Sequence, residues 1–159
     1  MLSQATIDSF QNDGIAFIPG LFKAHLDSLR MGVQKNIEEP GPYAAENLNE
    51  GEIGRFFDDY CNWQRINEFR NAAFDKNIAK AAALLMQSTT VQLFHDHVLV
   101  KAAGTLKPTP WHTDGPYYFV KGKKTLSFWV PLDPVKKATL RMVTGSCLLY
   151  TSPSPRDNR

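Results

Sequence analysis

The feature that most constrains the fold is a change of pattern near Gln87. Before this point, apolar residues recur at spacings of three and four, as they do along one face of a helix. After it, β-branched residues dominate and Gly or Pro stands in each connection, which is typical of strands. The pattern predicts helices over residues 4–13, 23–39 and 74–85, and strands over residues 89–101, 125–132 and 138–143. Helices followed by antiparallel strands indicate an α+β fold in which helices buttress a sandwich or barrel.

Two stretches between these elements carry no clear period. Residues 15–22 are expected to be extended, with a break at Pro19 and Gly20. In residues 41–73 the aromatic side chains are scattered, so we expect short helices and loops that pack on the body of the domain.

The overall balance of the chain is that of one soluble globular domain, because 43% of its 159 residues are hydrophobic and 21% are charged. A net charge of +2 gives no field that favours nucleic acid or an anionic membrane as partner. The first fourteen residues lack the basic start and apolar run of a secretory signal. With Cys61 and Cys147 interpreted as isolated thiols, we expect a cytoplasmic or organellar protein.

One short motif points to metal chemistry. His112 and Asp114 are two residues apart, and in an extended segment such residues point to the same face. An imidazole and a carboxylate so placed, joined by one distant histidine, form the facial arrangement that leaves positions open on non-haem Fe(II). The same tripeptide also occurs for packing reasons alone.

A second pair, His95 and His97, offers a rival metal site that resembles the start of a cupin motif. That motif requires a glutamate a few residues later, where this chain has Lys101 and Ala102. We therefore interpret both histidines as packing or outer-sphere residues. Asp96, on the opposite face of the same strand, is the alternative candidate to point into the barrel, and His25 is expected to be solvated on the polar side of its helix.

Several segments in the same order resemble the phytanoyl-CoA dioxygenase family of Fe(II)- and 2-oxoglutarate-dependent oxygenases. The segments are FQNDGIAFIPGLF, LFHDHVLVKAAGT, PTPWHTDGPYYFV, TLSFWVPLDPV and ATLRMVTGS. The resemblance covers residues 6–146 and implies N-terminal helices on a double-stranded β-helix, or jelly-roll, core. It also implies three partners: a small-molecule substrate, oxygen, and 2-oxoglutarate as co-substrate.

The resemblance also implies roles for individual residues. His112 and Asp114 would be iron ligands, and Trp129 and Val98 would line the 2-oxoglutarate pocket. Tyr117 and Tyr118 would face the substrate entrance. For Trp129 a place in the apolar core is an equal alternative, because large rings dominate barrel interiors.

The chain departs from the family pattern after Asp114, where neither histidine nor glutamate occurs. The family's third iron ligand and the arginine that holds 2-oxoglutarate are therefore missing, since Arg141 stands too early to be that arginine. After Gln87 there is room for only about four strands, whereas a jelly roll has eight. We thus expect an incomplete jelly roll.

The last segment, CLLYTSPSPRD, resembles the translation of a sequencing-library adapter. We interpret residues 1–146 as a partial dioxygenase domain and residues 147–159 as a non-native tail that forms an extended arm with few buried contacts. The leading hypothesis is that the parent protein hydroxylates a small organic substrate and that this fragment is inactive. The alternative is a non-catalytic jelly-roll binding module that has lost its iron site.

Overall fold

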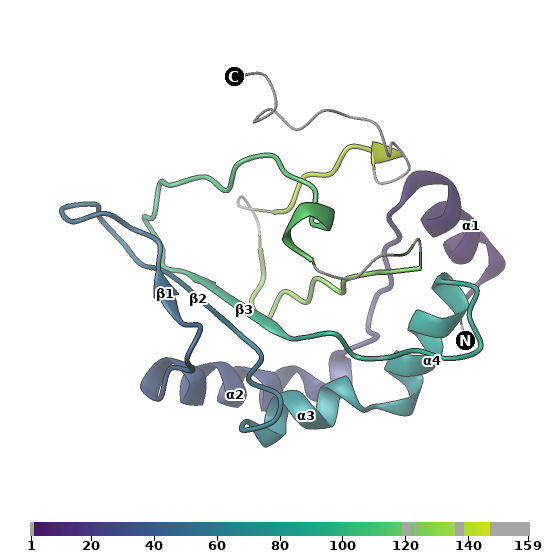
Figure 1. The fold of residues 1–159 in the computed structure, drawn as a ribbon, viewed down its shortest axis with the longest axis horizontal. Coiled ribbons are helices and arrows are strands. Elements are labelled where there is room, and N and C mark those ends of the chain that lie inside the picture. Colours follow the sequence, from purple (N-terminus) through teal and green to yellow (C-terminus); the bar gives the residue numbers. More distant parts are fainter. Residues whose placement is uncertain (1, 119–121, 123, 136–138, 147–159) are drawn as a thin grey trace. The chain divides into compact units, whose positions relative to one another are not determined.

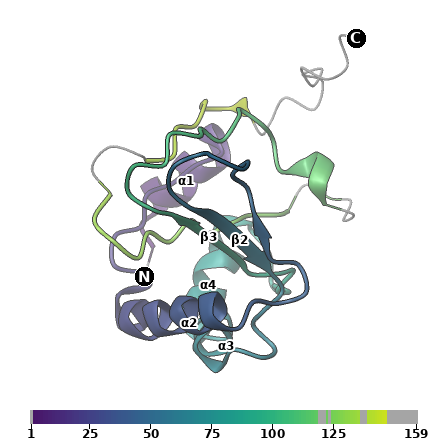
Figure 2. The ribbon, with the colours of Figure 1, turned by 90° about the vertical axis from the view of Figure 1, so that its left-hand side faces the viewer.

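The computed structural model describes residues 2–118, 122, 124–135 and 139–146. By its internal contacts the chain divides into two units, which are considered separately. Unit 1 comprises Met1–Pro19, Ala81–Thr90 and Pro110–Arg159, and unit 2 comprises Gly20–Lys80 and Val91–Thr109. Figures 1 and 2 show the ribbon from two directions.

Unit 2 combines a small antiparallel sheet with helices. Its elements are η1 (Lys23–His25), α2 (Leu26–Glu38), β1 (Ala45–Glu46), β2 (Phe56–Tyr60), α3 (Asn67–Ala73) and β3 (His97–Lys101). The strand order is β1-β2-β3, and in the central pair Asp59 lies opposite Val98. Helices α2 and α3 lie together beneath the sheet in Figure 1.

The apolar core of unit 2 lies between the sheet and these helices. Phe57 and Val98 from the strands pack with Ile66 and Phe69, and all four side chains are buried. The apolar stripe of α2 packs against this cluster through Leu29, Val33 and Ile37. Burying an aliphatic or aromatic side chain of this size contributes about 1.5–3 kcal/mol, so this cluster is a main source of the unit's stability.

A buried polar network lies beside the apolar core. The Asp59 side chain is fully buried. It accepts hydrogen bonds from Asn36 Nδ2 at 2.6 Å, Gly41 N at 2.7 Å and Tyr60 N at 2.8 Å. Gly41 has no room for a side chain, because a Cβ atom there would lie 2.4 Å from Asn62 Oδ1. The carboxylate therefore ties α2, the following loop and β2 together.

Unit 1 is held together mainly by helix ends and backbone contacts. Its helix α1 (Gln4–Asp13) begins at Ser3, whose Oγ accepts a hydrogen bond from Thr6 N at 3.1 Å, and ends at Gly14 with a left-handed φ of 75°. The Gly145 N–H donates to Asp13 O at 2.7 Å. The helix caps are local, whereas the bond from Gly145 to Asp13 joins the two ends of the described chain.

Two further helical elements contribute to unit 1. Helix α4 (Lys76–Leu85) contributes its second half to unit 1, and the short helix η2 (Gly115–Tyr117) follows the His112–Asp114 pair. Within the described residues, no helix is long and apolar enough to cross a membrane.

The helical predictions are confirmed, with α1 at the predicted bounds and α2 preceded by a short 3₁₀ turn. Strand β2 falls in the stretch predicted to be irregular, and that prediction is wrong there. Only His97–Lys101 of the first predicted strand pairs in a sheet. The residues described within 125–132 and 138–143 form no strand, because a strand requires a neighbour for its backbone hydrogen bonds.

The mixed α+β class is confirmed by four α-helices and the three-stranded sheet of the described residues. The jelly-roll core remains a prediction. The extended arm predicted for residues 147–159 lies outside the described residues.

Candidate metal and substrate site

His112 and Asp114 lie side by side in unit 1. Nε2 of His112 is 3.5 Å from Oδ1 of Asp114, and the side chains are 42% and 52% exposed, so solvent reaches both. Nδ1 of His112 lies 2.8 Å from the carbonyl oxygen of Pro110. A carbonyl can only accept, so Nδ1 carries the proton and a neutral ring keeps its lone pair on Nε2. The ring thus presents Nε2 to the carboxylate.

The donor set of this pair fits a divalent transition metal. Imidazole and carboxylate are the ligands of the 2-His-1-carboxylate iron sites. Metal bonds to such atoms are about 2.1 Å long, so two donor atoms 3.5 Å apart can reach the same ion. The hydrogen bond from Nδ1 to a backbone carbonyl is the support that metal-binding histidines commonly have. Within the described residues, no group of three His, Cys, Asp or Glu side chains could hold a metal ion.

The turn that follows the pair is closed by backbone hydrogen bonds. Tyr117 N donates to Asp114 O at 2.9 Å, and Tyr118 N donates to Gly115 O at 3.2 Å. The Tyr117 ring is 60% exposed and meets the His112 ring edge to face, with centroids 5.9 Å apart. Tyr117 therefore borders the metal pair on an open surface.

Tyr118 differs from its neighbour because its side chain is partly buried. The pKa of Tyr118 is raised, mainly by burial and further by the charge and hydrogen bond of Asp114, while a hydrogen bond with Ser127 acts in the opposite direction. The prediction that both tyrosines face the substrate is not tested by these contacts.

The two residues predicted to bind 2-oxoglutarate lie in different environments. Trp129 is 47% exposed in unit 1, and Val98 is buried in the core of unit 2 beside Phe57. The structure shows an apolar packing role for Val98. The assignment of either residue to a co-substrate pocket stays a prediction.

The histidines outside the pair make contacts of another kind. His97 Nε2 lies 3.4 Å from Asp58 Oδ2, and its ring stacks on Tyr60 with centroids 4.0 Å apart. The ring of His95 contacts Phe94 at 4.7 Å. Both histidines are therefore packed against neighbouring side chains of unit 2.

One prediction for unit 2 is wrong, and a second residue there has partners that its spacing did not indicate. His25 is not simply solvated, because its Nε2 lies 3.0 Å from Asp75 Oδ2 and only 17% of its side chain is exposed. The Asp96 carboxylate accepts hydrogen bonds from the backbone N–H groups of Asn62 and Trp63, and its direction relative to a barrel stays a prediction. Both contacts join segments more than 30 residues apart, which residue spacing does not reveal.

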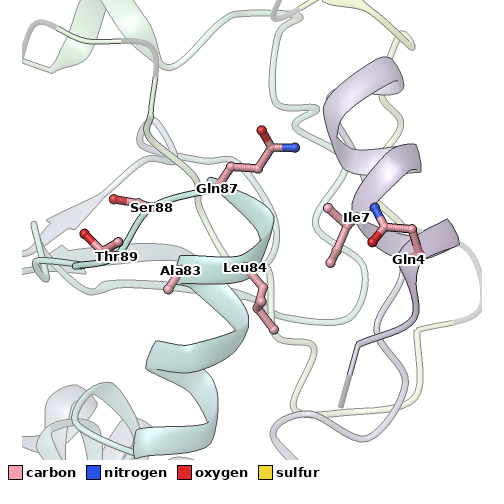
Figure 3. Close-up of a pocket in the computed structure, with 7 residues that line it drawn as sticks. All are labelled: Gln4, Ile7, Ala83, Leu84, Gln87, Ser88 and Thr89. Carbon is pink, nitrogen blue, oxygen red and sulfur yellow. The ribbon is translucent and has the colours of Figure 1, made fainter.

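The structure also has a hollow of about 350 Å³ in unit 1, between α1 and the end of α4 (Figure 3). It is lined by Gln4, Ile7, Ala83, Leu84, Gln87, Ser88 and Thr89. None of these side chains ionises near neutral pH, and none belongs to the predicted site. The lining of this hollow therefore offers no imidazole or carboxylate ligand.

The sequence profile of the phytanoyl-CoA dioxygenase (PhyH) family matches residues 10–158. The chain belongs to this family. PhyH proteins are dioxygenases that use iron and 2-oxoglutarate. No curated protein and no solved structure matches the chain.

Proposed function

We propose that this PhyH-family chain is part of an Fe(II)- and 2-oxoglutarate-dependent dioxygenase that hydroxylates a small organic substrate. The observation that carries the proposal is the 3.5 Å approach of His112 Nε2 to Asp114 Oδ1, with the other ring nitrogen held by Pro110 O. When bound, iron would supply the oxygen chemistry together with 2-oxoglutarate. The family match supports this assignment.

The roles of the chain's own residues follow from their contacts. His112 offers a neutral nitrogen and Asp114 an anionic oxygen, which together suit a hard to borderline divalent ion. Pro110 O fixes the orientation of the imidazole. The exposed ring of Tyr117 would contact the apolar part of a substrate beside His112, and Trp129 is proposed to contact the co-substrate.

We further propose that residues 1–146 are part of a longer natural enzyme and that residues 147–159 derive from an adapter. The longer protein would supply a third ligand and a carboxylate-binding arginine. On this proposal the chain of 159 residues binds iron weakly and does not convert 2-oxoglutarate to succinate, because two protein ligands hold the ion less firmly than three.

Succinate formation tests the proposed function. In the longer natural protein, loaded with Fe(II) without oxygen and then oxygenated, we expect Asp114→Ala to abolish succinate and His97→Ala to retain most of it. Equal loss in both variants would contradict the assignment of the metal pair. No succinate from the unaltered longer protein, with 2-oxoglutarate present, would favour a non-catalytic binding module.

The chain of 159 residues itself is the second arm of this test. Succinate above the level of a His112→Ala control would show that it is active as it stands, and would overturn the proposal that it is an inactive fragment.

A further inference from the structure

The donor atoms of the metal pair are spaced for a tetrahedral ion. Nε2 of His112 and Oδ1 of Asp114 lie 3.5 Å apart. Bonds of about 2.1 Å that meet at a tetrahedral angle place two donor atoms about 3.4 Å apart. Zn(II) prefers this geometry and accepts imidazole and carboxylate ligands. The pair therefore suits two of the four positions around a Zn(II) ion.

The pair lies on an open surface, where a second molecule can reach it. The side chains of His112 and Asp114 are 42% and 52% exposed. Trp111, which precedes His112, is 61% exposed, and Tyr117, whose ring meets the His112 ring, is 60% exposed. All four residues belong to unit 1. Aromatic side chains are enriched in protein interfaces, so a molecule that approaches the ion here also buries apolar surface.

Unit 2 contains an imidazole–carboxylate pair of almost the same spacing that is not open in this way. His97 Nε2 lies 3.4 Å from Asp58 Oδ2, but only 10% of the Asp58 side chain is exposed. Asn47 Nδ2 donates to the other carboxylate oxygen of Asp58 at 2.7 Å. An ion at this pair is shielded from a second molecule, which makes the His97–Asp58 pair an internal control.

We propose that one Zn(II) ion joins two copies of this chain through the His112–Asp114 pair of each. The inference rests on the proposed function, in which the same pair binds the metal. Two copies related by a twofold axis present the same surface to each other. Each copy then supplies one nitrogen and one oxygen, so the four positions of the ion are filled. The two Asp114 carboxylates also neutralise the charge of the ion.

The experiment measures the association state of the full chain by sedimentation while Zn(II) is added. We expect a monomer without metal, a maximum of dimer at about one Zn(II) per two chains, and a return to monomer when excess Zn(II) gives each pair its own ion. The chelator EDTA should dissociate the dimer. This rise and fall distinguishes a bridging ion from metal-induced aggregation, which only increases as Zn(II) is added.

Substitutions at the two pairs supply matched controls. His112→Ala and Asp114→Ala should each abolish the Zn(II)-dependent dimer, because each removes half of the ligands. His97→Ala should leave the dimer and its dependence on Zn(II) unchanged, because His97 lies at the shielded pair. Circular dichroism of each variant checks that it is folded.

Several results would overturn the inference. They are a dimer that forms without Zn(II), that excess Zn(II) does not reverse, that persists in His112→Ala or Asp114→Ala, or that is lost in His97→Ala. Zn(II) binding to a chain that stays monomeric, and that requires both His112 and Asp114, also overturns the bridge but leaves the metal pair of the proposed function intact. Absent Zn(II) binding, or binding that requires neither residue, refutes the metal pair as well, so the two failures are distinguishable.

Discussion

Two aspartates, one in each unit, differ in how deeply their carboxylates are buried and in the partners that contact them. Asp59 in unit 2 is fully buried and accepts three hydrogen bonds at 2.6–2.8 Å. Asp114 in unit 1 is 52% exposed and faces His112. The Asp59 carboxylate thus holds α2, the following loop and β2 together. The Asp114 carboxylate is open to solvent and available to a ligand.

The surroundings of the two aspartates differ as well. Around Asp59, strands and helices far apart in sequence enclose a common apolar core. Around Asp114, the contacts come mostly from the same short stretch, from Pro110 to Tyr118. The structure thus separates a region whose order depends on tertiary packing from a motif whose geometry is mainly local.

The sharpest test of this contrast is the same substitution at both aspartates. Asp59→Ala leaves buried donors without an acceptor and should lower the free energy of unfolding by about 3–5 kcal/mol. Asp114→Ala should lower it by less than about 1 kcal/mol, because water replaces the lost contacts. Urea denaturation of the two variants measures both values, and similar losses would show that the two regions do not differ as described.

A second pair of variants compares apolar side chains. Val98→Ala should cost about 2 kcal/mol, because it leaves a cavity beside Phe57 in the core of unit 2. Val143→Ala, at a side chain that is 60% exposed, should change stability by less than about 0.5 kcal/mol. The urea denaturation midpoints of the two variants measure both stability changes. A negligible cost at Val98 would argue against its core role and in favour of the predicted co-substrate pocket.

A third test uses the pH dependence of stability. Burial alone would raise the pKa of Asp59, but hydrogen bonds from Asn36, Gly41, Tyr60 and Asn62 outweigh it, and the pKa is lowered. The stabilisation is therefore fully present above the unfolded-state pKa of about 3.9 and is lost as the pH falls through the lower folded-state value.

Urea denaturation between pH 2 and pH 6 should accordingly show a steep loss of stability on the acid side of that range. Asp59→Asn should flatten this part of the profile, whereas Val98→Ala, which removes no titratable group, should leave its shape as it is. A profile that is the same in all three proteins would contradict the account of the buried network.

The smallest effect is expected at the end of the chain. If residues 147–159 derive from an adapter, they were never selected to pack on this domain, so deleting them should change the free energy of unfolding by less than about 0.5 kcal/mol. A large drop in the urea midpoint on deletion would show that the segment is a structural element of the domain.

Sequence reasoning succeeded where structure depends on nearby residues. The cap at Ser3 and the apolar periodicity were enough to place α1 and α4. The proximity of His112 and Asp114 likewise follows from their spacing of two residues.

It failed where distant partners decide the outcome. Strand β2 contains adjacent aspartates, which break the alternation expected of a strand, and Asp59 becomes buried only because Asn36 and Gly41 meet it from 23 and 18 residues away. The opposite error occurs at residues 125–132, which have the composition of a strand but form none. The turn from Asp114 to Tyr118 is likewise closed by backbone hydrogen bonds that residue spacing alone does not predict.

The central claim, that His112 and Asp114 form the metal site, can be tested by titrating the full chain with Mn(II) and following its histidine ring signals by NMR. The chain has four histidines, at positions 25, 95, 97 and 112, so each signal can be assigned by substitution. A paramagnetic ion broadens the signals of its own ligands first, even when it binds weakly. We expect the His112 signal to broaden first and this selectivity to disappear in Asp114→Ala. Earlier broadening of His95 and His97 would contradict the claim and place the metal in unit 2.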